Sequence, residues 1–251
     1  MSINKFAILG ERCSGTNFLE EAINNNFTIS YTAENGNKHF FCYNNYSNSD
    51  NTLFIGIVRN PIYWINSFSM ELHHVPEINR KNINNFLFNE FYSVEDELDT
   101  NKLLQDNSIF KFNGKFYTHK YKLNVKDLNY LNGKKYKNIF ELRKVKNDFL
   151  INIMPKKVKN YILINYEDLL FNYNDVLQKI KENFNLSQKN KDFIKVKNYK
   201  KSNTYNFVQQ RKILLSPSIV VLIWKNLDKE QENSLGYKIW DNNNFFKNNN
   251  V

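Results

Sequence analysis

The chain has 251 residues, a net charge of +10 and 41% hydrophobic residues, so it can bury the core of one large domain. Its two cysteines exclude a disulfide framework of the secreted type. No apolar run approaches the roughly 18 residues of a membrane-spanning helix. The N-terminal residues lack the apolar stretch of a signal peptide, so we expect a cytoplasmic protein.

The basic charge has an unusual composition. The chain contains 45 asparagines and 30 lysines but only three alanines and five arginines. This bias is typical of an AT-rich coding sequence, so most of the lysine charge is background and predicts no specific nucleic-acid partner. Arginine, with its planar and bidentate donor, is therefore the more informative cation. The five are Arg12, Arg59, Arg80, Arg143 and Arg211.

Three apolar segments alternate with helical patterns along the chain. Residues 4–9 predict a buried strand that ends at Gly10, and a helical pattern follows from Phe18. Residues 52–58 predict a second strand, followed by Asn60 as N-cap and Pro61 at the first helical position. Residues 161–166 predict a third strand before another helix.

This alternation predicts an α/β fold with three layers, in which helices flank a mostly parallel sheet. Between and after the strands, residues 77–95, 139–153 and 218–232 have helical patterns. Residues 108–118 predict a β-hairpin because Asn113-Gly114 separates two apolar runs. We expect a single domain over residues 1–240 and a low-complexity tail over residues 241–251.

The first strand and helix are joined by a loop with the spacing of a phosphate-binding loop. Gly10 and Gly15 are separated by four residues, and this strand–loop–helix context presents backbone N–H groups to an anion. The Gly-Lys-Ser/Thr ending of nucleotide triphosphatases is replaced by Gly15-Thr16-Asn17, which argues against ATP or GTP hydrolysis. An ordinary strand–helix turn is the alternative.

The second strand ends in Arg59-Asn60-Pro61, and Ser67 follows about two turns into the next helix. Ligands of open α/β sheets bind where strands end, and an arginine with a hydroxyl can hold a phosphate. Taken alone, this pattern is more typical of a helix start with a surface arginine.

The two motifs together resemble the sulfotransferase superfamily, whose members use 3′-phosphoadenosine 5′-phosphosulfate (PAPS). The similar segments are Arg12-Cys13-Ser14-Gly15-Thr16-Asn17, Arg59 with Ser67 eight residues later, and Tyr166-Glu167-Asp168-Leu169. The resemblance implies the P-loop-like sulfotransferase fold and metal-independent transfer of a sulfuryl group to a carbohydrate, small alcohol or phenol. It implies that residues 12–17 bind the 5′-phosphosulfate, and that Arg59, Ser67 and the pair Arg211-Lys212 bind the 3′-phosphate.

The resemblance also implies a Lys-His pair on the strand before the arginine strand, here Lys38 and His39. His39 would accept the proton of the acceptor hydroxyl while Lys38 stabilises the leaving phosphate. Glu11 is the competing base, because carbohydrate-directed members use a carboxylate. Cys13 stands where many members have Lys or Arg, so Arg12 or Lys38 would supply that charge.

The remaining polar residues have mainly structural interpretations. His73-His74 are either acceptor-site residues or a surface pair, and Glu167 or Asp168 is expected to cap the helix that follows. Arg143 is expected to face solvent or pair with a carboxylate, and no spacing of ligands suggests a metal site. Two other functions stay open: a small-molecule kinase that needs Mg²⁺, and a non-catalytic anion- or nucleic-acid-binding protein.

Overall fold

The structure, a computed structural model, describes residues 2–71, 75–94, 109–112, 115–118, 122–123, 126–199, 205–206 and 213–238. Its centre is a parallel sheet of four strands in the order β2-β1-β3-β9. These strands are β1 (Lys5–Leu9), β2 (Ser30–Tyr31), β3 (Thr52–Val58) and β9 (Tyr161–Asn165). The three strands predicted from apolar runs are confirmed, and the short β2 is an addition to them.

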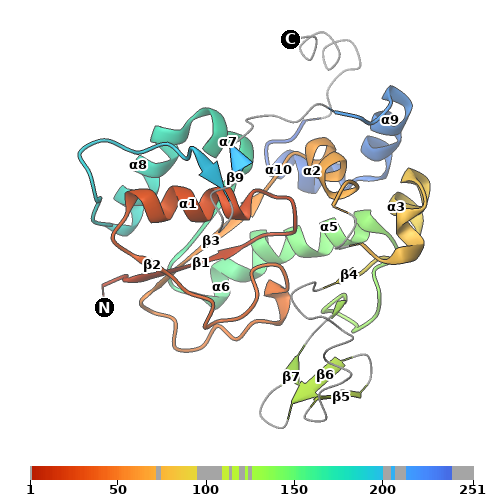
Figure 1. Cartoon of the computed structure of the whole chain (residues 1–251), viewed down its shortest axis with the longest axis horizontal. Coiled ribbons are helices and arrows are strands. Elements are labelled where there is room, and N and C mark those ends of the chain that lie inside the picture. Colours follow the sequence, from red (N-terminus) through yellow and green to blue (C-terminus); the bar gives the residue numbers. More distant parts are fainter. Residues whose placement is uncertain are drawn as a thin grey trace.

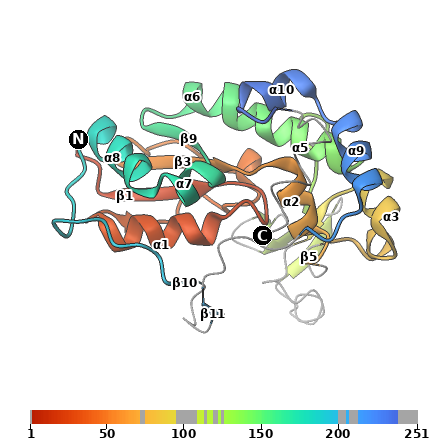
Figure 2. The same ribbon diagram turned by 90° about the horizontal axis from the view of Figure 1, so that it is seen from above.

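The sheet is covered by helices on both faces, as Figures 1 and 2 show. One face is covered by α1 (Thr16–Asn26), α7 (Tyr166–Phe171) and α8 (Tyr173–Phe184). The other is covered by α5 (Ile139–Asp148), the π-helical turn η4 (Phe149–Ile153) and α6 (Met154–Lys157). The three-layer α/β arrangement predicted from the sequence is therefore present.

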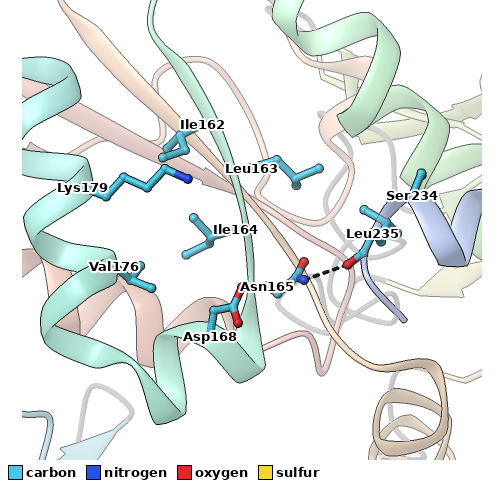
Figure 3. Close-up of a pocket in the computed structure, with 9 residues that line it drawn as sticks. All are labelled: Ile162, Leu163, Ile164, Asn165, Asp168, Val176, Lys179, Ser234 and Leu235. Carbon is cyan, nitrogen blue, oxygen red and sulfur yellow. Dashed lines mark hydrogen bonds between the residues drawn. The ribbon is translucent and has the colours of Figure 1, made fainter. Parts of the chain in front are cut away.

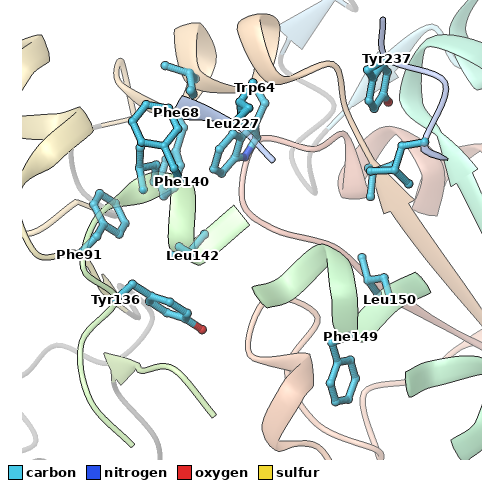
Figure 4. Packing of buried hydrophobic residues seen from close by; sticks show 14 of the residues in the cluster. Trp64, Phe68, Phe91, Tyr136, Phe140, Leu142, Phe149, Leu150, Leu227 and Tyr237 are labelled. Carbon is cyan, nitrogen blue, oxygen red and sulfur yellow. The ribbon is translucent and has the colours of Figure 1, made fainter. Parts of the chain in front are cut away.

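Alternate residues of each central strand enter two separate apolar cores, because successive side chains of a strand point to opposite faces. Phe6 and Ile8 pack with α1, α7 and α8. Ala7 and Leu9 pack in the larger core on the α5 side. Figure 4 shows that larger core, with Trp64 and Phe68 of α2 (Pro61–Phe68) among its members.

Short elements surround the carboxyl ends of the strands and the edges of the domain. The helices are α3 (Ile83–Phe88), α9 (Pro217–Asn226) and α10 (Lys229–Ser234), with 3₁₀ turns η1 (Phe41–Tyr43) and η3 (Glu77–Arg80). The small strands are β4 (Ser93–Val94), β5 (Ile109–Phe112), β6 (Lys115–Thr118), β7 (Lys122–Leu123), β8 (Lys126–Asp127), β10 (Asn198–Tyr199) and β11 (Tyr205–Asn206). β5 and β6 pair antiparallel, which confirms the predicted hairpin.

Several helix predictions need correction. Residues 218–232 form two helices, because Asp228 accepts a hydrogen bond from the N–H of Gln231 and so caps a new helix, α10. The predicted helix over residues 77–95 is wrong: the described part of it, residues 77–94, contains a 3₁₀ turn, the short α3 and the strand β4. The predicted N-cap of α2 is confirmed, since Asn60 Oδ1 accepts from the N–H of Ile62 at 3.0 Å.

Part of the predicted organisation lies outside the described residues, namely the tail over residues 241–251. Among the helices within the described ranges, none is both long and apolar enough to cross a membrane.

Candidate functional site

The loop between β1 and α1 adopts a strained, compact conformation. Cys13 has φ 64° and Gly15 has φ 95°, so both residues lie in the left-handed region. A Cβ atom at Gly15 would lie 2.2 Å from Cδ2 of Tyr166, so only glycine fits against that ring. An observed strain of this kind is typical of ligand-binding loops. The loop leads directly into the N-terminus of α1, where backbone N–H groups lack intrahelical partners.

The two motifs predicted from the sequence meet at this loop. Arg59 Nη1 donates to the carbonyl oxygen of Cys13 at 2.9 Å, although the residues are 46 positions apart. The Cys13 thiol also shares a hydrogen bond with Ser67. Burial, together with the charge of Glu71, raises the pKa of the Cys13 thiol to about 12, so this thiol stays protonated and unreactive. Arg59, Ser67 and residues 13–15 therefore form one site.

Arg59 is held so that part of its guanidinium is left for another acceptor. Its plane lies over the ring of Tyr166, with Cζ 4.9 Å from the ring centroid. Its Nε is buried and has no hydrogen-bond partner among the described residues. A buried donor without a partner has a free-energy cost, which an anion at this position would remove. These residues fit a phosphate or sulfate group.

His39 lies beside the loop, but the expectation that it sits on a strand is wrong. β2 ends at Tyr31, and Lys38 and His39 occupy an irregular segment before η1. Nδ1 of His39 lies 2.9 Å from the carbonyl oxygen of Gly10. Because a carbonyl only accepts, Nδ1 carries the proton and Nε2 of the neutral ring keeps its lone pair. Burial and the nearby Arg12 lower the pKa of His39 well below its usual value, which favours this neutral form.

Lys38 points to the first turns of α1. Its Nζ donates to Asn17 Oδ1 at 2.7 Å and lies 3.5 Å from Glu20 Oε2. The predicted pair therefore lies against the loop, with Lys38 bonded to Asn17 and His39 bonded to Gly10. Ser14 and Thr16, also predicted as binding residues, are buried within it.

Arg12 is buried, with 3% of its surface exposed, and its guanidinium lies 5.2 Å from the centroid of the Phe40 ring. Its backbone is fixed from two sides. The N–H donates to Glu11 Oε1 at 2.7 Å, and the carbonyl accepts from Trp64 Nε1 at 2.9 Å. The side chain of Arg12 is therefore packed inside the protein beneath the loop.

Glu11 takes part in a buried ionic cluster. Oε1 accepts from the N–H of Arg12, and Oε2 accepts from Lys146 Nζ, which also bonds to Asp127. Lys146 donates further to the carbonyl oxygen of His39 at 2.6 Å. Burial opposes the charge of Lys146, but Asp127 and Glu11 outweigh that effect and raise its pKa. Both oxygens of Glu11 are therefore engaged, which leaves His39 as the better placed base.

A second buried ion pair lies beside Arg59. Arg143 is 4% exposed, so the expectation that it faces solvent is wrong, whereas the expected carboxylate partner is present. Its Nε and Nη2 donate to the two oxygens of Glu232 at 2.5 and 2.8 Å. Nη2 also donates to the carbonyl oxygen of Arg59 at 3.0 Å. In the sequence, the burial of Arg143 is indicated only by its position on the apolar face of the predicted helix.

Glu167 does not cap α7, because its carboxylate reaches two remote groups. Oε1 accepts from the N–H of Asn60 at 3.0 Å, and Oε2 accepts from the hydroxyl of Tyr237 at 2.9 Å. Burial raises the pKa of Glu167 despite these bonds. The N-cap residue of α7 is Asn165, whose side chain makes no capping bond. Glu167 thus ties the Arg59 turn to the C-terminal segment.

Some predicted residues lie outside the described ranges: Arg211, Lys212, His73 and His74. Cys13 and Cys42 are both free thiols.

A hollow of about 240 Å³ lies along the outer edge of β9, the last strand of the sheet (Figure 3). Its walls come from β9, Asp168, α8 and the end of α10, and none of the predicted site residues lines it.

No protein-family model, curated protein or solved structure matches this chain. What the site can do therefore follows from its own geometry. The loop, the helix N-terminus and Arg59 favour an anionic group, and a neutral histidine with a free Nε2 stands beside it.

Proposed function

We propose that this chain transfers a sulfuryl group from PAPS to the hydroxyl group of an acceptor. The observation that carries the proposal is the hydrogen bond from Arg59 to the loop carbonyl of Cys13. It joins the two segments that resemble the 5′-phosphosulfate and 3′-phosphate motifs of sulfotransferases. A nucleotide with phosphates at both ends would use both segments at once.

Residues 12–17 bind the 5′-phosphosulfate through backbone N–H groups and the N-terminus of α1. Arg59 binds the 3′-phosphate with the guanidinium atoms that Cys13 does not use, and Ser67 adds a hydroxyl. Arg211 and Lys212 complete this contact in the proposal. Arg12, Lys38 and Arg59 supply the positive charge near the phosphates.

His39 acts as the general base. Its Nε2 accepts the proton of the acceptor hydroxyl as that oxygen forms a bond to sulfur. The bond from sulfur to the bridging oxygen breaks in line, and its electron pair leaves with 3′-phosphoadenosine 5′-phosphate (PAP). The tautomer fixed by Gly10 supports this role, because it leaves the lone pair of His39 on Nε2. The acceptor is a carbohydrate or a small alcohol or phenol.

Calorimetric titration with PAP tests the proposal. We expect the wild-type protein to bind PAP, and Arg59→Ala to bind it about a hundredfold more weakly, since charge-assisted bonds contribute roughly 1.5–3 kcal/mol. Arg80→Ala is the matched control, because Arg80 is an exposed arginine whose Nε donates to Val75. Its affinity for PAP should equal that of the wild type.

The same titration separates the other functions. Failure of the wild-type protein to bind PAP would overturn the sulfotransferase proposal. Binding of ATP only in the presence of Mg²⁺ would instead favour a kinase. Steeply salt-dependent binding to nucleic acid of any sequence, unchanged by Arg59→Ala, would favour a non-catalytic binding protein.

A further inference from the structure

The buried face of α5 carries two cations that the proposed reaction does not use directly. Arg143 and Lys146 are three positions apart, so they lie on the same side of the helix. They are 4% and 1% exposed, whereas the side chain of the intervening Lys144 is 61% exposed. Two buried cations beneath a single site require a specific reason, because burying a charge is costly unless it is paired.

Each cation reaches a different half of the candidate site. Arg143 donates to the carbonyl oxygen of Arg59, the residue assigned to the 3′-phosphate. Lys146 bonds to Glu11 in the loop and to the carbonyl oxygen of His39. Arg143 and Lys146 thus bond to the backbone of Arg59 and His39, and neither bonds to the guanidinium of Arg59 or to the imidazole of His39.

Each cation is also neutralised by a carboxylate from a distant segment. Glu232 of α10 pairs with Arg143, and Asp127 of β8 pairs with Lys146. The ring of Trp64 lies 5.2 Å from Cζ of Arg143, and the indole N–H of Trp64 donates to the loop carbonyl of Arg12. Each cation is therefore held in place by buried contacts of its own, and Trp64 packs between Arg143 and the loop.

We propose that Arg143 and Lys146 are positioning residues through which α5 fixes the 3′-phosphate half and the loop half of the site separately. This inference rests on the proposed function. Arg143 sets the position of Arg59, and Lys146 sets the positions of the loop and of His39. Loss of one contact should then impair one half of the site and spare the other.

The test compares the affinities for two ligands, PAP and adenosine 5′-phosphate, which lacks the 3′-phosphate. Arg143→Lys keeps the charge beside Glu232, but one ammonium cannot reproduce the planar set of three hydrogen bonds. We expect PAP affinity to fall about fivefold and that of adenosine 5′-phosphate to stay within about twofold, since one hydrogen bond contributes about 1 kcal/mol.

The loop half is tested with the double variant Lys146→Met, Asp127→Asn, which removes one buried charge of each sign. We expect both ligands to lose about tenfold in affinity, because they share the 5′-phosphate that the loop binds. Lys144→Ala is the control on the exposed side of the same helix, and it should change neither affinity. Urea unfolding of each variant reports whether it is folded at the temperature of the titration.

The outcomes separate this inference from the proposed function. If the wild-type protein binds PAP but Arg143→Lys weakens both ligands equally, or weakens neither, the separate positioning of the two halves is wrong. A double variant that binds both ligands as tightly as the wild type would overturn the role of Lys146. If the wild-type protein does not bind PAP, the proposed function fails and this inference fails with it.

Discussion

The two faces of the sheet are stabilised differently. On the face covered by α1, α7 and α8, the strands contact a core of aliphatic and aromatic side chains. The face covered by α5 also has an apolar core, but it contains buried ion pairs, one at the loop residue Glu11 and one beside Arg59. Stability alone favours the first arrangement, because apolar burial carries no cost of desolvating charge. The second arrangement places polar contacts where a site needs fixed geometry.

The largest expected effect comes from the apolar face. Leu177 of α8 is fully buried, so Leu177→Ala should lower the free energy of unfolding by about 2–5 kcal/mol through the cavity it leaves. Because Leu177 belongs to the core remote from α5, the folded variant should bind PAP with the affinity of the wild type. Urea unfolding and calorimetry measure the two effects. A large loss of PAP affinity in the folded variant would contradict the division between the faces.

A smaller effect is expected at the loop. Gly15→Ala places a methyl group against Tyr166 in a left-handed conformation, which should cost about 1–3 kcal/mol of stability and weaken PAP binding. Gly133→Ala is the matched control, since Gly133 also has positive φ (71°) but its Cβ would meet nothing within 4 Å. Both variants place alanine at a positive φ, which costs stability in each, but only Gly15→Ala also introduces a clash with Tyr166. Only Gly15→Ala should therefore change the affinity for PAP. Equal affinities would show that the contact with Tyr166 does not shape the site.

The smallest expected effect is a pH dependence from the charged face. Burial raises the pKa of Asp127 to about 6, although the Lys146 ammonium beside it acts in the opposite direction. The folded protein therefore binds this proton more tightly than the unfolded chain does. The contribution of Asp127 to stability is present near pH 4 and is lost as the pH rises through about 6.

Asp127→Asn should remove that contribution. The free energy of unfolding of the wild type, measured relative to Asp127→Asn, should fall between about pH 3.8 and pH 6, the window set by the ordinary pKa and the raised pKa of Asp127. Taking the difference cancels the opposite trend of His39 and the parallel trend of Glu167, whose pKa values are shifted in both proteins. A difference that is flat or rises with pH would contradict the raised pKa of Asp127.

Local signals predicted most of the framework. The apolar run over residues 52–58 became β3 with the same bounds, because a continuous apolar segment fits only a strand covered on both faces. Asn60 and Pro61 predicted the start of α2, because capping depends on neighbouring residues alone. The helical pattern over 218–232 predicts one element, but the structure has two, because the backbone is extended at Leu227 and a new helix begins after Asp228.

The site itself was predicted only in part. The loop, Arg59 and Ser67 were found from motif spacing, and the hydrogen bonds of Arg59 and Ser67 with Cys13 bring these segments together. Arg143 and Lys146 were not assigned to the site, since the helical pattern over 139–153 does not reveal which remote carboxylates will meet its cations. Glu11 was a candidate base from its position in the loop, but its oxygens are taken by partners 1 and 135 positions away.

The strands, the loop between β1 and α1 and the arginine at the end of β3 can be predicted from the sequence, since hydrophobic period, glycine spacing and capping are local properties. The burial of particular cations and the tautomer of His39 become evident only in the folded chain. Both depend on groups far away in the chain, Glu232 and Asp127 for the cations and the carbonyl of Gly10 for the histidine. Whether a charge can be buried depends on these tertiary contacts, because a buried charge is tolerated only where another segment of the chain supplies a partner.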